Sequence, residues 1–212
     1  DIETDVDGLK DYLTFQFCLG GKTLFVGVNE IPPAHLLIIR DGNVKVEKYW
    51  EVYYSLDFDH TEKYFQDRLE SLVSESVSLH MQSDVPVGAY VSGGLDSSTI
   101  ASLAAKLVQK NEMIGFNGRF KEFGSAFDES DYAKAVAHYS GFDLKIRDIH
   151  CNDFLEHIRN VIYHMDFPVA GPGALPQYLV SQEASQHRKV LLGGQGGDEI
   201  FGGYIRYLVA YF

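Results

Sequence analysis

A glycine-rich junction between an apolar run and a helical stretch constrains this chain more than any other feature. Residues 92–98 read Ser-Gly-Gly-Leu-Asp-Ser-Ser. They follow the apolar run Val85–Val91 and precede residues 99–109, which have the composition of a helix. A strand that turns through two glycines into a helix is typical of an open α/β sheet, because glycine lets the backbone turn tightly. The sequence therefore predicts a strand, a tight loop and a helix in immediate succession.

The same loop offers the groups that bind an anion such as pyrophosphate. Gly93 and Gly94 can bring backbone N–H groups close to an oxyanion, and the helix that follows adds N–H groups and the positive end of its dipole. Hydroxyl donors come from three serines, Ser92, Ser97 and Ser98. Asp96 can hold a magnesium ion against the phosphates, because Mg²⁺ prefers hard oxygen ligands. An ordinary strand-to-helix turn is the alternative interpretation of these residues.

Apolar runs and helical stretches alternate from residue 62 onward. Strands are expected at 85–91, 113–120, 144–149 and 190–192. Helices are expected at 62–82, 99–110, 129–139, 152–164 and 174–186, with a loop rich in proline and glycine at 167–172. This alternation predicts an α/β fold, with a parallel sheet and helices on both of its faces. Ligands of such sheets bind beyond the carboxyl ends of the strands.

Residues 1–57 form a different, β-rich segment. Short β-like runs are expected at 24–28, 34–39 and 44–50, separated by glycine and proline pairs. Asp41-Gly42-Asn43 lies between the second and third runs and predicts a hairpin turn. We expect residues 1–57 to belong to one domain and residues 58–212 to another.

A second glycine-rich segment follows the last expected strand. Six glycines fall between Gly193 and Gly203, and Asp198 and Glu199 lie among them. Such backbone is costly to order, so it is expected where a ligand comes close to the main chain. Together with Asp96, these acidic residues could complete a magnesium site, since carboxylates and phosphate oxygens suit the octahedral ion. A solvated acidic turn is the alternative interpretation.

The composition excludes some classes of partner. The chain has 212 residues, of which 45% are hydrophobic and 23% charged, as in an ordinary globular domain. Its formal net charge of −12 argues against a nucleic-acid groove, which needs clustered Lys and Arg. No apolar stretch approaches the roughly 20 residues that span a bilayer, and no signal segment is recognised, so we expect a cytoplasmic protein without membrane contact. Cys18 and Cys151 are expected in the core rather than in a disulfide.

Neither end of the sequence has the pattern expected of a natural chain terminus. The first residue is Asp1, and residues 204–212 continue an apolar helical pattern with no capping residue after it. We therefore expect the chain to be an excised piece of a longer protein.

Three segments, in this order, carry a resemblance to a known family. Residues 92–98, the stretch Phe-Asp-Glu-Ser-Asp-Tyr-Ala at 127–133, and residues 194–204 resemble the synthetase half of glutamine-dependent asparagine synthetases. These enzymes belong to the N-type ATP pyrophosphatases. Residues 9–50 are similar to the last strands of the glutaminase domain of this family. The resemblance implies a Rossmann-like fold of the adenine-nucleotide alpha-hydrolase type.

The resemblance also implies a two-step reaction and a set of site residues. The side-chain carboxylate of aspartate attacks the α-phosphate of ATP, and ammonia from glutamine then displaces AMP to give asparagine. The catalytic residues by matching position are Asp96, Gln195 and Asp198, and magnesium is held by Asp96 and Asp198. Pyrophosphate is held by Ser92, Gly93, Gly94, Asp96, Ser97 and Ser98. The residues that line the nucleotide-binding site by matching position are Val91, Ile114, Gly193 and Gly194. A homodimer is a further expectation.

Two positions depart from the family pattern. The family commonly has Glu at the position of Gln195, and often Asp-Glu-Pro at the position of Asp166-Phe167-Pro168. An amide cannot act as a base or carry negative charge. The N-terminal Cys nucleophile of the family and its basic carboxyl-terminal residues have no counterpart here, so we expect the chain by itself not to make asparagine.

Other functions remain open beside an aspartate ligase. A related adenylating enzyme could act on another carboxylate, as a β-lactam-forming synthetase or an amidotransferase of surface-sugar pathways. A module that binds ATP without turnover is a third interpretation, and Gln195 is the feature that favours it. A tRNA-modifying pyrophosphatase would share the first loop but should be basic, which this chain is not.

Overall fold

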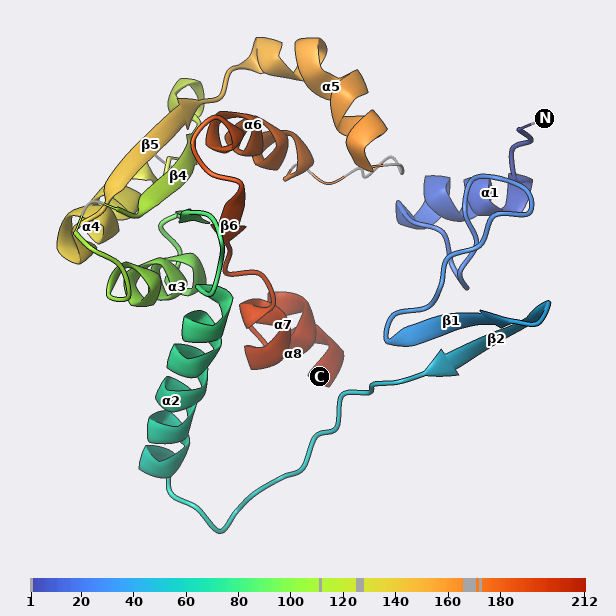
Figure 1. Cartoon of the computed structure of the whole chain (residues 1–212). Coiled ribbons are helices and arrows are strands. Elements are labelled where there is room, and N and C mark those ends of the chain that lie inside the picture. Colours follow the sequence, from blue (N-terminus) through green and yellow to red (C-terminus); the bar gives the residue numbers. More distant parts are fainter. Residues whose placement is uncertain (1, 111, 125–127, 166–170, 172) are drawn as a thin grey trace. The chain divides into compact units, whose positions relative to one another are not determined.

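The computed structural model describes residues 2–110, 112–124, 128–165, 171 and 173–212 (Figure 1). The chain divides into two compact units, and the second begins at Thr61. This division falls close to the expected boundary at residue 57, and the domain roles expected for the two parts stay predictions. Among the described residues, none of the helices combines the length and hydrophobicity that crossing a lipid bilayer requires.

The first unit contains one helix and one hairpin. Helix α1 (Val6–Phe15) begins after Asp5, whose carboxylate accepts a hydrogen bond from the Gly8 N–H at 2.7 Å. Strands β1 (His35–Arg40) and β2 (Asn43–Lys48) pair antiparallel, which confirms the predicted hairpin. Asp41 and Gly42 both have positive φ, 50° and 78°, as a tight two-residue hairpin turn requires.

The expected strand at 24–28 is wrong. Phe25 makes only an isolated bridge, to Thr4, because the Thr23 hydroxyl folds this segment into a turn by donating to the Val28 carbonyl at 2.8 Å. Gly27 has a φ of 77°, which is incompatible with an extended strand. The expectation that both cysteines are core residues is also wrong for Cys151, which is exposed at the start of a helix, whereas Cys18 is half-buried.

The second unit is built on a sheet of four parallel strands in the order β5-β4-β3-β6. The strands are β3 (Val87–Tyr90), β4 (Ile114–Arg119), β5 (Asp143–Asp148) and β6 (Val190–Leu192). The helices are α2 (Glu62–His80), α3 (Leu95–Ala105), α4 (Ser130–Ser140), α5 (Cys151–Met165), α6 (Ala174–Ser185), α7 (Gly197–Phe201) and α8 (Ile205–Tyr211). A 3₁₀ turn, η1 (Lys121–Phe123), follows β4.

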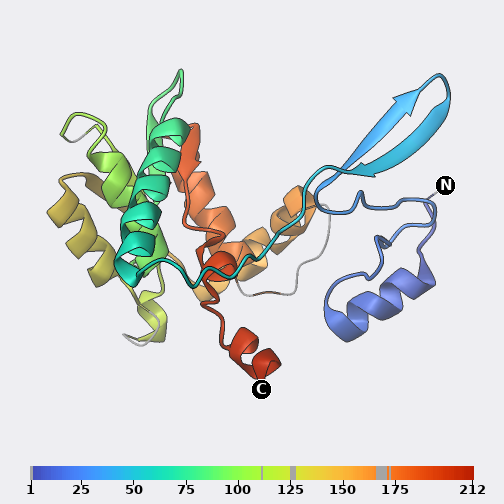
Figure 2. The ribbon, with the colours of Figure 1, turned by 90° about the horizontal axis from the view of Figure 1, so that it is seen from below.

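Helices cover both faces of this sheet, as predicted. The chain steps from β3 to β4 to β5 in one direction, and right-handed crossovers place α3 and α4 on one face. It then returns past β4 and β3 to β6 through α5 and α6, which therefore lie on the other face (Figures 1 and 2). Contacts agree with this arrangement, since α3 packs on β3 and α6 packs on β4 and β5.

Small apolar side chains let the helices approach the sheet closely. Ala89 and Val91 beside β3, and Ala101 and Ala104 on α3, are fully buried, and Met113 completes this cluster at 2% exposed. Strand β3 is covered on both faces, which explains why its sequence reads as a continuous apolar run. The central strand is thus fixed firmly under the loop that follows it.

Helix α3 begins four residues earlier than the periodicity predicts, at Leu95 rather than residue 99, and ends at Ala105. Gly94 is its N-cap and adopts an extended conformation. The glycine loop therefore passes into the helix without an intervening turn, and Asp96 lies in the first helical turn. The expected loop at 167–172, except Gly171, and the departure at Asp166-Phe167-Pro168 lie outside the described residues.

We predict that Met113→Ala lowers the free energy of unfolding by about 2–5 kcal/mol, because it deletes a buried side chain and leaves a cavity. Chemical denaturation followed by circular dichroism measures this change. Leu155→Ala is the control, since that side chain is 78% exposed on α5 and its removal should matter little. Equal losses in the two variants would contradict the assignment of the core.

Candidate active site

Two glycine-rich loops meet at the carboxyl ends of the neighbouring strands β3 and β6. Strand β3 is the first strand of this sheet along the chain, and it pairs with β4 on one side and with β6 on the other. The chain therefore leaves β3 toward β4 and returns to its opposite side at β6. Such a switch point opens a crevice beyond the strand ends, where α/β sheets bind their ligands. One loop, residues 91–94, follows β3, and the other, residues 193–196, follows β6. The sequence predicted both loops but not that their strands are neighbours.

The backbone of the second loop touches the first turn of α3, which directly continues the first loop. A Cβ added to Gly194 would lie 2.6 Å from the Ser97 nitrogen and 2.9 Å from the carbonyl carbon of Asp96. A Cβ added to Gly197 would lie 2.5 Å from Asp96 Oδ2. Only glycine fits at position 194, where the close atoms are backbone, and the close approach at Gly197 shows that the carboxylate of Asp96 rests against the start of α7.

The Ser97 hydroxyl holds the first loop in shape. Ser97 Oγ accepts a hydrogen bond from the Ser92 N–H at 3.1 Å and lies 2.8 Å from the Ser92 hydroxyl. It also donates to the Gly94 carbonyl at 3.3 Å. Gly93 has a φ of 96°, and a Cβ there would lie 2.8 Å from the Glu129 carbonyl oxygen. These contacts fix the loop against α4, while the first N–H groups of α3 have no partner within the helix and can meet an anion.

The three serines expected to donate to pyrophosphate occupy different environments. Ser97 is 9% exposed, whereas Ser92 is exposed on the loop. The hydroxyls of both residues take part in loop contacts, and Ser92 Oγ accepts a hydrogen bond from the Gly94 N–H at 3.2 Å. Ser98 Oγ is buried and has no hydrogen-bond partner among the described residues. Ser92 is thus the serine that the structure presents at the surface of the crevice.

Glu199 closes the second loop. Its Oε2 accepts a hydrogen bond from the Gly196 N–H at 3.1 Å, and its Oε1 accepts one from the Tyr204 hydroxyl at 2.8 Å. The donor on Tyr204 lowers the pKa of Glu199, and the same contact raises the pKa of the Tyr204 phenol. Both carboxylate oxygens therefore carry hydrogen bonds within this segment, and the expectation that Glu199 joins a magnesium site with Asp96 stays a prediction.

Gln195 lies in the second loop, and Asp198 lies in α7, the helix that directly follows this loop. Asp198 is half-buried on α7, directly after the glycine that contacts Asp96, and its carboxylate packs against Gly203. The Gln195 side chain is exposed and folds back over Gly193. Asp96 thus lies in the first turn of α3 and Asp198 in the first turn of α7. Hard carboxylate donors of this kind suit a magnesium ion that also binds phosphate oxygens, and the expected joint magnesium site stays a prediction.

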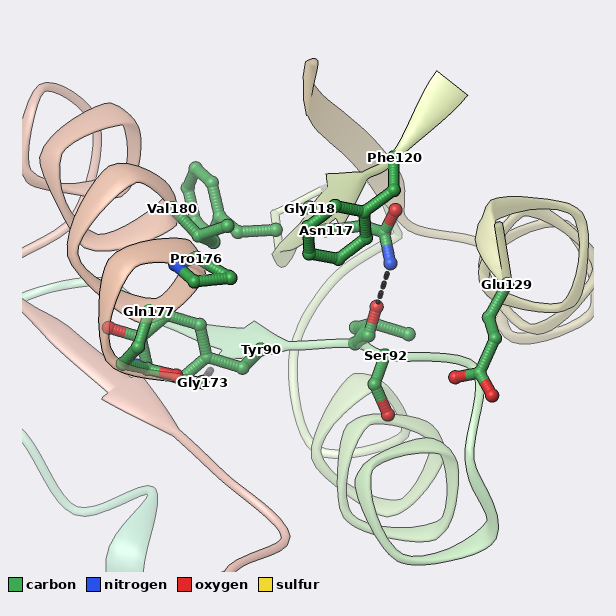
Figure 3. Close-up of a pocket in the computed structure, with 12 residues that line it drawn as sticks. Tyr90, Ser92, Asn117, Gly118, Phe120, Glu129, Gly173, Pro176, Gln177 and Val180 are labelled. Carbon is green, nitrogen blue, oxygen red and sulfur yellow. Dashed lines mark hydrogen bonds between the residues drawn. The ribbon is translucent and has the colours of Figure 1, made fainter. Parts of the chain in front are cut away.

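A cavity of about 390 Å³ opens beside the first loop, at the carboxyl ends of β3 and β4 (Figure 3). Its lining includes Tyr90, Val91, Ser92, Phe116, Asn117 and Glu129. Ile114, which was expected to contact the nucleotide, is not among the residues that line this cavity. It begins β4 at the opposite end of the sheet, pairs with Gly88, and packs under the cluster around Phe116. Asn117, Phe120 and Glu129 line the cavity although sequence reasoning did not single them out.

A second group of metal-capable side chains lies at the start of α5. Ligand atoms of Asp153, Glu156 and His157 lie within 4.8 Å of one another. The Asp153 carboxylate already accepts hydrogen bonds from the Arg147 guanidinium at 3.1 Å and from the His150 N–H at 2.7 Å. Helix capping and an ion pair account for this carboxylate, so the crevice between β3 and β6 remains the candidate site.

The arrangement of the two loops agrees with a comparison to protein families. The model of the asparagine synthase family matches residues 68–212. The chain belongs to this family. The match covers every element of the crevice, from the β3 loop through α7 and α8.

Curated relatives extend the match to nearly the whole chain. Asparagine synthetase [glutamine-hydrolyzing] 1 of Bacillus subtilis is 35% identical over 205 residues, which are 96% of this chain and 32% of that protein. A putative asparagine synthetase [glutamine-hydrolyzing] of Mycobacterium bovis is 31% identical over 98% of this chain and 32% of that protein. Amidase chyE of Penicillium rubens is 27% identical, with 86% and 30% covered. The chain spans about a third of the length of these relatives.

Among solved structures, an NH3-dependent NAD synthetase from Campylobacter jejuni matches with a TM-score of 0.42 and 15% identity. The match covers 71% of this chain and 62% of that one.

We predict that Tyr204→Phe raises the pKa of Glu199 toward its ordinary value, because the O–H donor is lost. The lowered pKa means that this contact stabilises the α7 cap at neutral pH and is lost as the pH falls through that pKa. A carboxylate titration by NMR measures the shift. Tyr207→Phe is the control, since no bond joins Tyr207 to Glu199 among the hydrogen bonds found. An unchanged Glu199 titration in Tyr204→Phe would contradict the assignment.

Proposed function

We propose that this chain carries the nucleotide-binding part of an ATP-dependent ligase that converts aspartate to asparagine through β-aspartyl-AMP. Ammonia would come from glutamine in a full-length protein of the size of its relatives. The membership of the asparagine synthase family supports a ligase of this type. The printed names of relatives such as the Bacillus subtilis protein support the choice of aspartate and glutamine.

One observation carries the proposal, namely the backbone contact of Gly194 with Asp96 and Ser97. It brings the start of α3, with its N–H groups and Asp96, against the second loop, which leads directly into α7 and Asp198. A triphosphate needs both kinds of group, because N–H donors meet its oxygens and carboxylates bind the metal that accompanies it. Magnesium bound by these carboxylates would neutralise charge on the departing pyrophosphate.

The residues of the first loop would bind and orient pyrophosphate. Ser92 lies exposed on the loop, and Ser97 fixes the loop so that the N–H group of Gly93 keeps a set direction. The Gly94 N–H donates to Ser92 Oγ at 3.2 Å and would have to exchange this bond for one to pyrophosphate. Attack on a phosphoryl group needs mainly positioning and charge stabilisation, which a rigid loop at a helix N-terminus supplies. Val91, Gly193 and Gly194 would approach the nucleotide through their backbones.

The proposed reaction balances in two steps. A carboxylate oxygen of aspartate forms a bond to the α-phosphorus, the bond from that phosphorus to the bridging oxygen breaks, and pyrophosphate leaves with the electron pair. Ammonia nitrogen then bonds to the acyl carbon, the bond from this carbon to the AMP oxygen breaks, and the nitrogen loses a proton. Neither step needs an oxidant or a reductant.

Gln195 favours a second candidate, a site that adenylates another acid or binds ATP without turnover. The amide lies over Gly193 at the crevice and can form hydrogen bonds but cannot take a proton or carry negative charge. In the aspartate ligase that we propose, Gln195 would therefore orient a substrate by hydrogen bonding. The acid that supports pyrophosphate release distinguishes the candidates.

The first unit of the chain would belong to the glutaminase part of such a ligase. Its hairpin and helix α1 expose many apolar side chains, including Leu36, Ile38 and Val46. Residues 1–57 would thus complete the amidotransferase domain, and residues 58–212 would begin the synthetase domain.

We predict that the full-length protein forms AMP and pyrophosphate from Mg-ATP and ammonium only when L-aspartate is present. Asp96→Ala should lower this rate at least about 100-fold, because it removes the carboxylate at the loop contact. Asp143→Ala is the matched control, since that exposed carboxylate lies at the amino end of β5. Quantifying AMP and pyrophosphate by chromatography checks both.

AMP formation that does not depend on aspartate but depends on another acid would show that this other acid, and not aspartate, is the acceptor substrate. Bound ATP with no AMP would favour the non-catalytic candidate. Activity of Asp96→Ala equal to that of Asp143→Ala would refute the assignment of the crevice.

A further inference from the structure

Asn117 is a buried carboxamide at the edge of the cavity in Figure 3. It is 3% exposed on β4, and its Nδ2 donates a hydrogen bond to the Val91 carbonyl at 2.8 Å. A carbonyl oxygen only accepts hydrogen bonds, so this contact fixes which end of the amide is the nitrogen. Figure 3 shows the Asn117 oxygen pointing the opposite way, on the side of Phe120.

That oxygen, Asn117 Oδ1, has no hydrogen-bond partner among the described residues. An amide oxygen enclosed without a donor is unfavourable, because it has given up its bonds to water. The cavity lining includes side chains that carry donors, those of Tyr90, Ser92 and Gln177, but none of them bonds to this oxygen. The position therefore calls for a hydrogen-bond donor that the protein itself does not supply.

The position of Asn117 associates this unmet acceptor with the candidate nucleotide site. Asn117 reaches across to the carbonyl of Val91, the residue that opens the first glycine loop. The Val91 N–H in turn donates to the Phe116 carbonyl at 2.8 Å, so the two strand ends are held side by side. Aromatic rings of Tyr90, Phe116 and Phe120 contribute to the same lining, as suits a flat heterocycle.

A carboxamide held in this way matches one nucleobase better than others. Its oxygen can accept from the 6-amino group of adenine, and its second N–H can donate to a neighbouring ring nitrogen, the pairing by which Asn reads adenine in DNA. A 6-oxopurine presents a carbonyl oxygen at that place, and two acceptors repel each other. We propose that Asn117 reads the 6-amino group of adenine and sets the preference of this site for adenine over 6-oxopurine nucleotides. This assignment rests on the proposed function, which places a nucleotide in the crevice.

The test compares ATP, inosine triphosphate and purine riboside triphosphate, which differ at position 6 by an amine, an oxygen or a hydrogen. Dissociation constants come from calorimetry on the full-length protein, and kcat/KM comes from AMP formation. The wild-type protein should bind ATP at least about 10-fold more tightly than inosine triphosphate, since a buried acceptor rejects the oxo group. Purine riboside triphosphate should fall between them.

Two variants remove the amide oxygen in different ways. Asn117→Val deletes the whole amide, and Asn117→Thr keeps a hydroxyl that can donate to the Val91 carbonyl if the first variant fails to fold. Either variant should bring the ratio of ATP to inosine triphosphate affinity within about 3-fold of unity, mainly by weakening ATP. Tyr90→Phe is the matched control, since it removes a hydroxyl of the same lining that bonds to Ser181 and should leave the ratio unchanged.

The outcomes separate this assignment from the proposed function. Wild-type selectivity retained in both Asn117 variants, with ATP still bound, would overturn the role of Asn117 and leave the ligase proposal standing. A wild-type protein that binds none of the three nucleotides would overturn both. A loss of selectivity in Tyr90→Phe equal to that in the Asn117 variants would also overturn the assignment, because it would trace the effect to general repacking of the cavity.

Discussion

The structure of the site depends on one contact, in which the backbone of Gly194 lies directly against Asp96 and Ser97. No side chain fits between the two loops, so their distance is set by the sheet that carries them. Strands β3 and β6 are hydrogen-bonded neighbours, although about a hundred residues separate them along the chain. The crevice therefore exists because the strand order places the first and last strands side by side, at the switch point of the sheet.

Each loop is then fixed by a different internal device. At the first loop, the Ser97 hydroxyl forms hydrogen bonds with the Ser92 N–H and the Gly94 carbonyl. At the second loop, Glu199 caps α7 and accepts a hydrogen bond from the Tyr204 hydroxyl. These residues are occupied in shaping the backbone, so we assign the proposed magnesium ion to the carboxylates of Asp96 and Asp198. Rigid loops of this kind suit a reaction in which positioning and charge stabilisation are the main tasks.

The sequence predicted the parallel sheet, the hairpin and both loops, because alternation and glycine clusters are local signals. It failed where long-range packing decides. Helix α1 was missed although Val6, Leu9 and Leu13 have helical spacing after the capping residue Asp5, because neighbouring β-like runs suggested strands. Helix α7 was missed because its glycines and acids read as a loop, and only the structure shows Glu199 capping it.

The same contrast between local signals and long-range packing applies to single residues of the site. Ile114 was assigned to the nucleotide, but the register of β4 puts it at the amino end of the strand. Asn117 and Arg119 are the polar residues of that run, and their place in its second half could have indicated the carboxyl end from the sequence. The buried environments of Ser97 and Ser98 depend on how α3 packs, which no local pattern gives.

The affinity of a Gly194→Ala variant of the full-length protein for Mg-ATP tests the central claim most directly. The added methyl group would meet the backbone of Ser97 and Asp96, so the two loops must separate. We predict a loss of affinity of at least about 10-fold, with the circular dichroism spectrum retained, because misplaced binding groups lose their combined effect. An affinity equal to that of the wild-type protein would contradict the claim that the two loops form one phosphate-binding site.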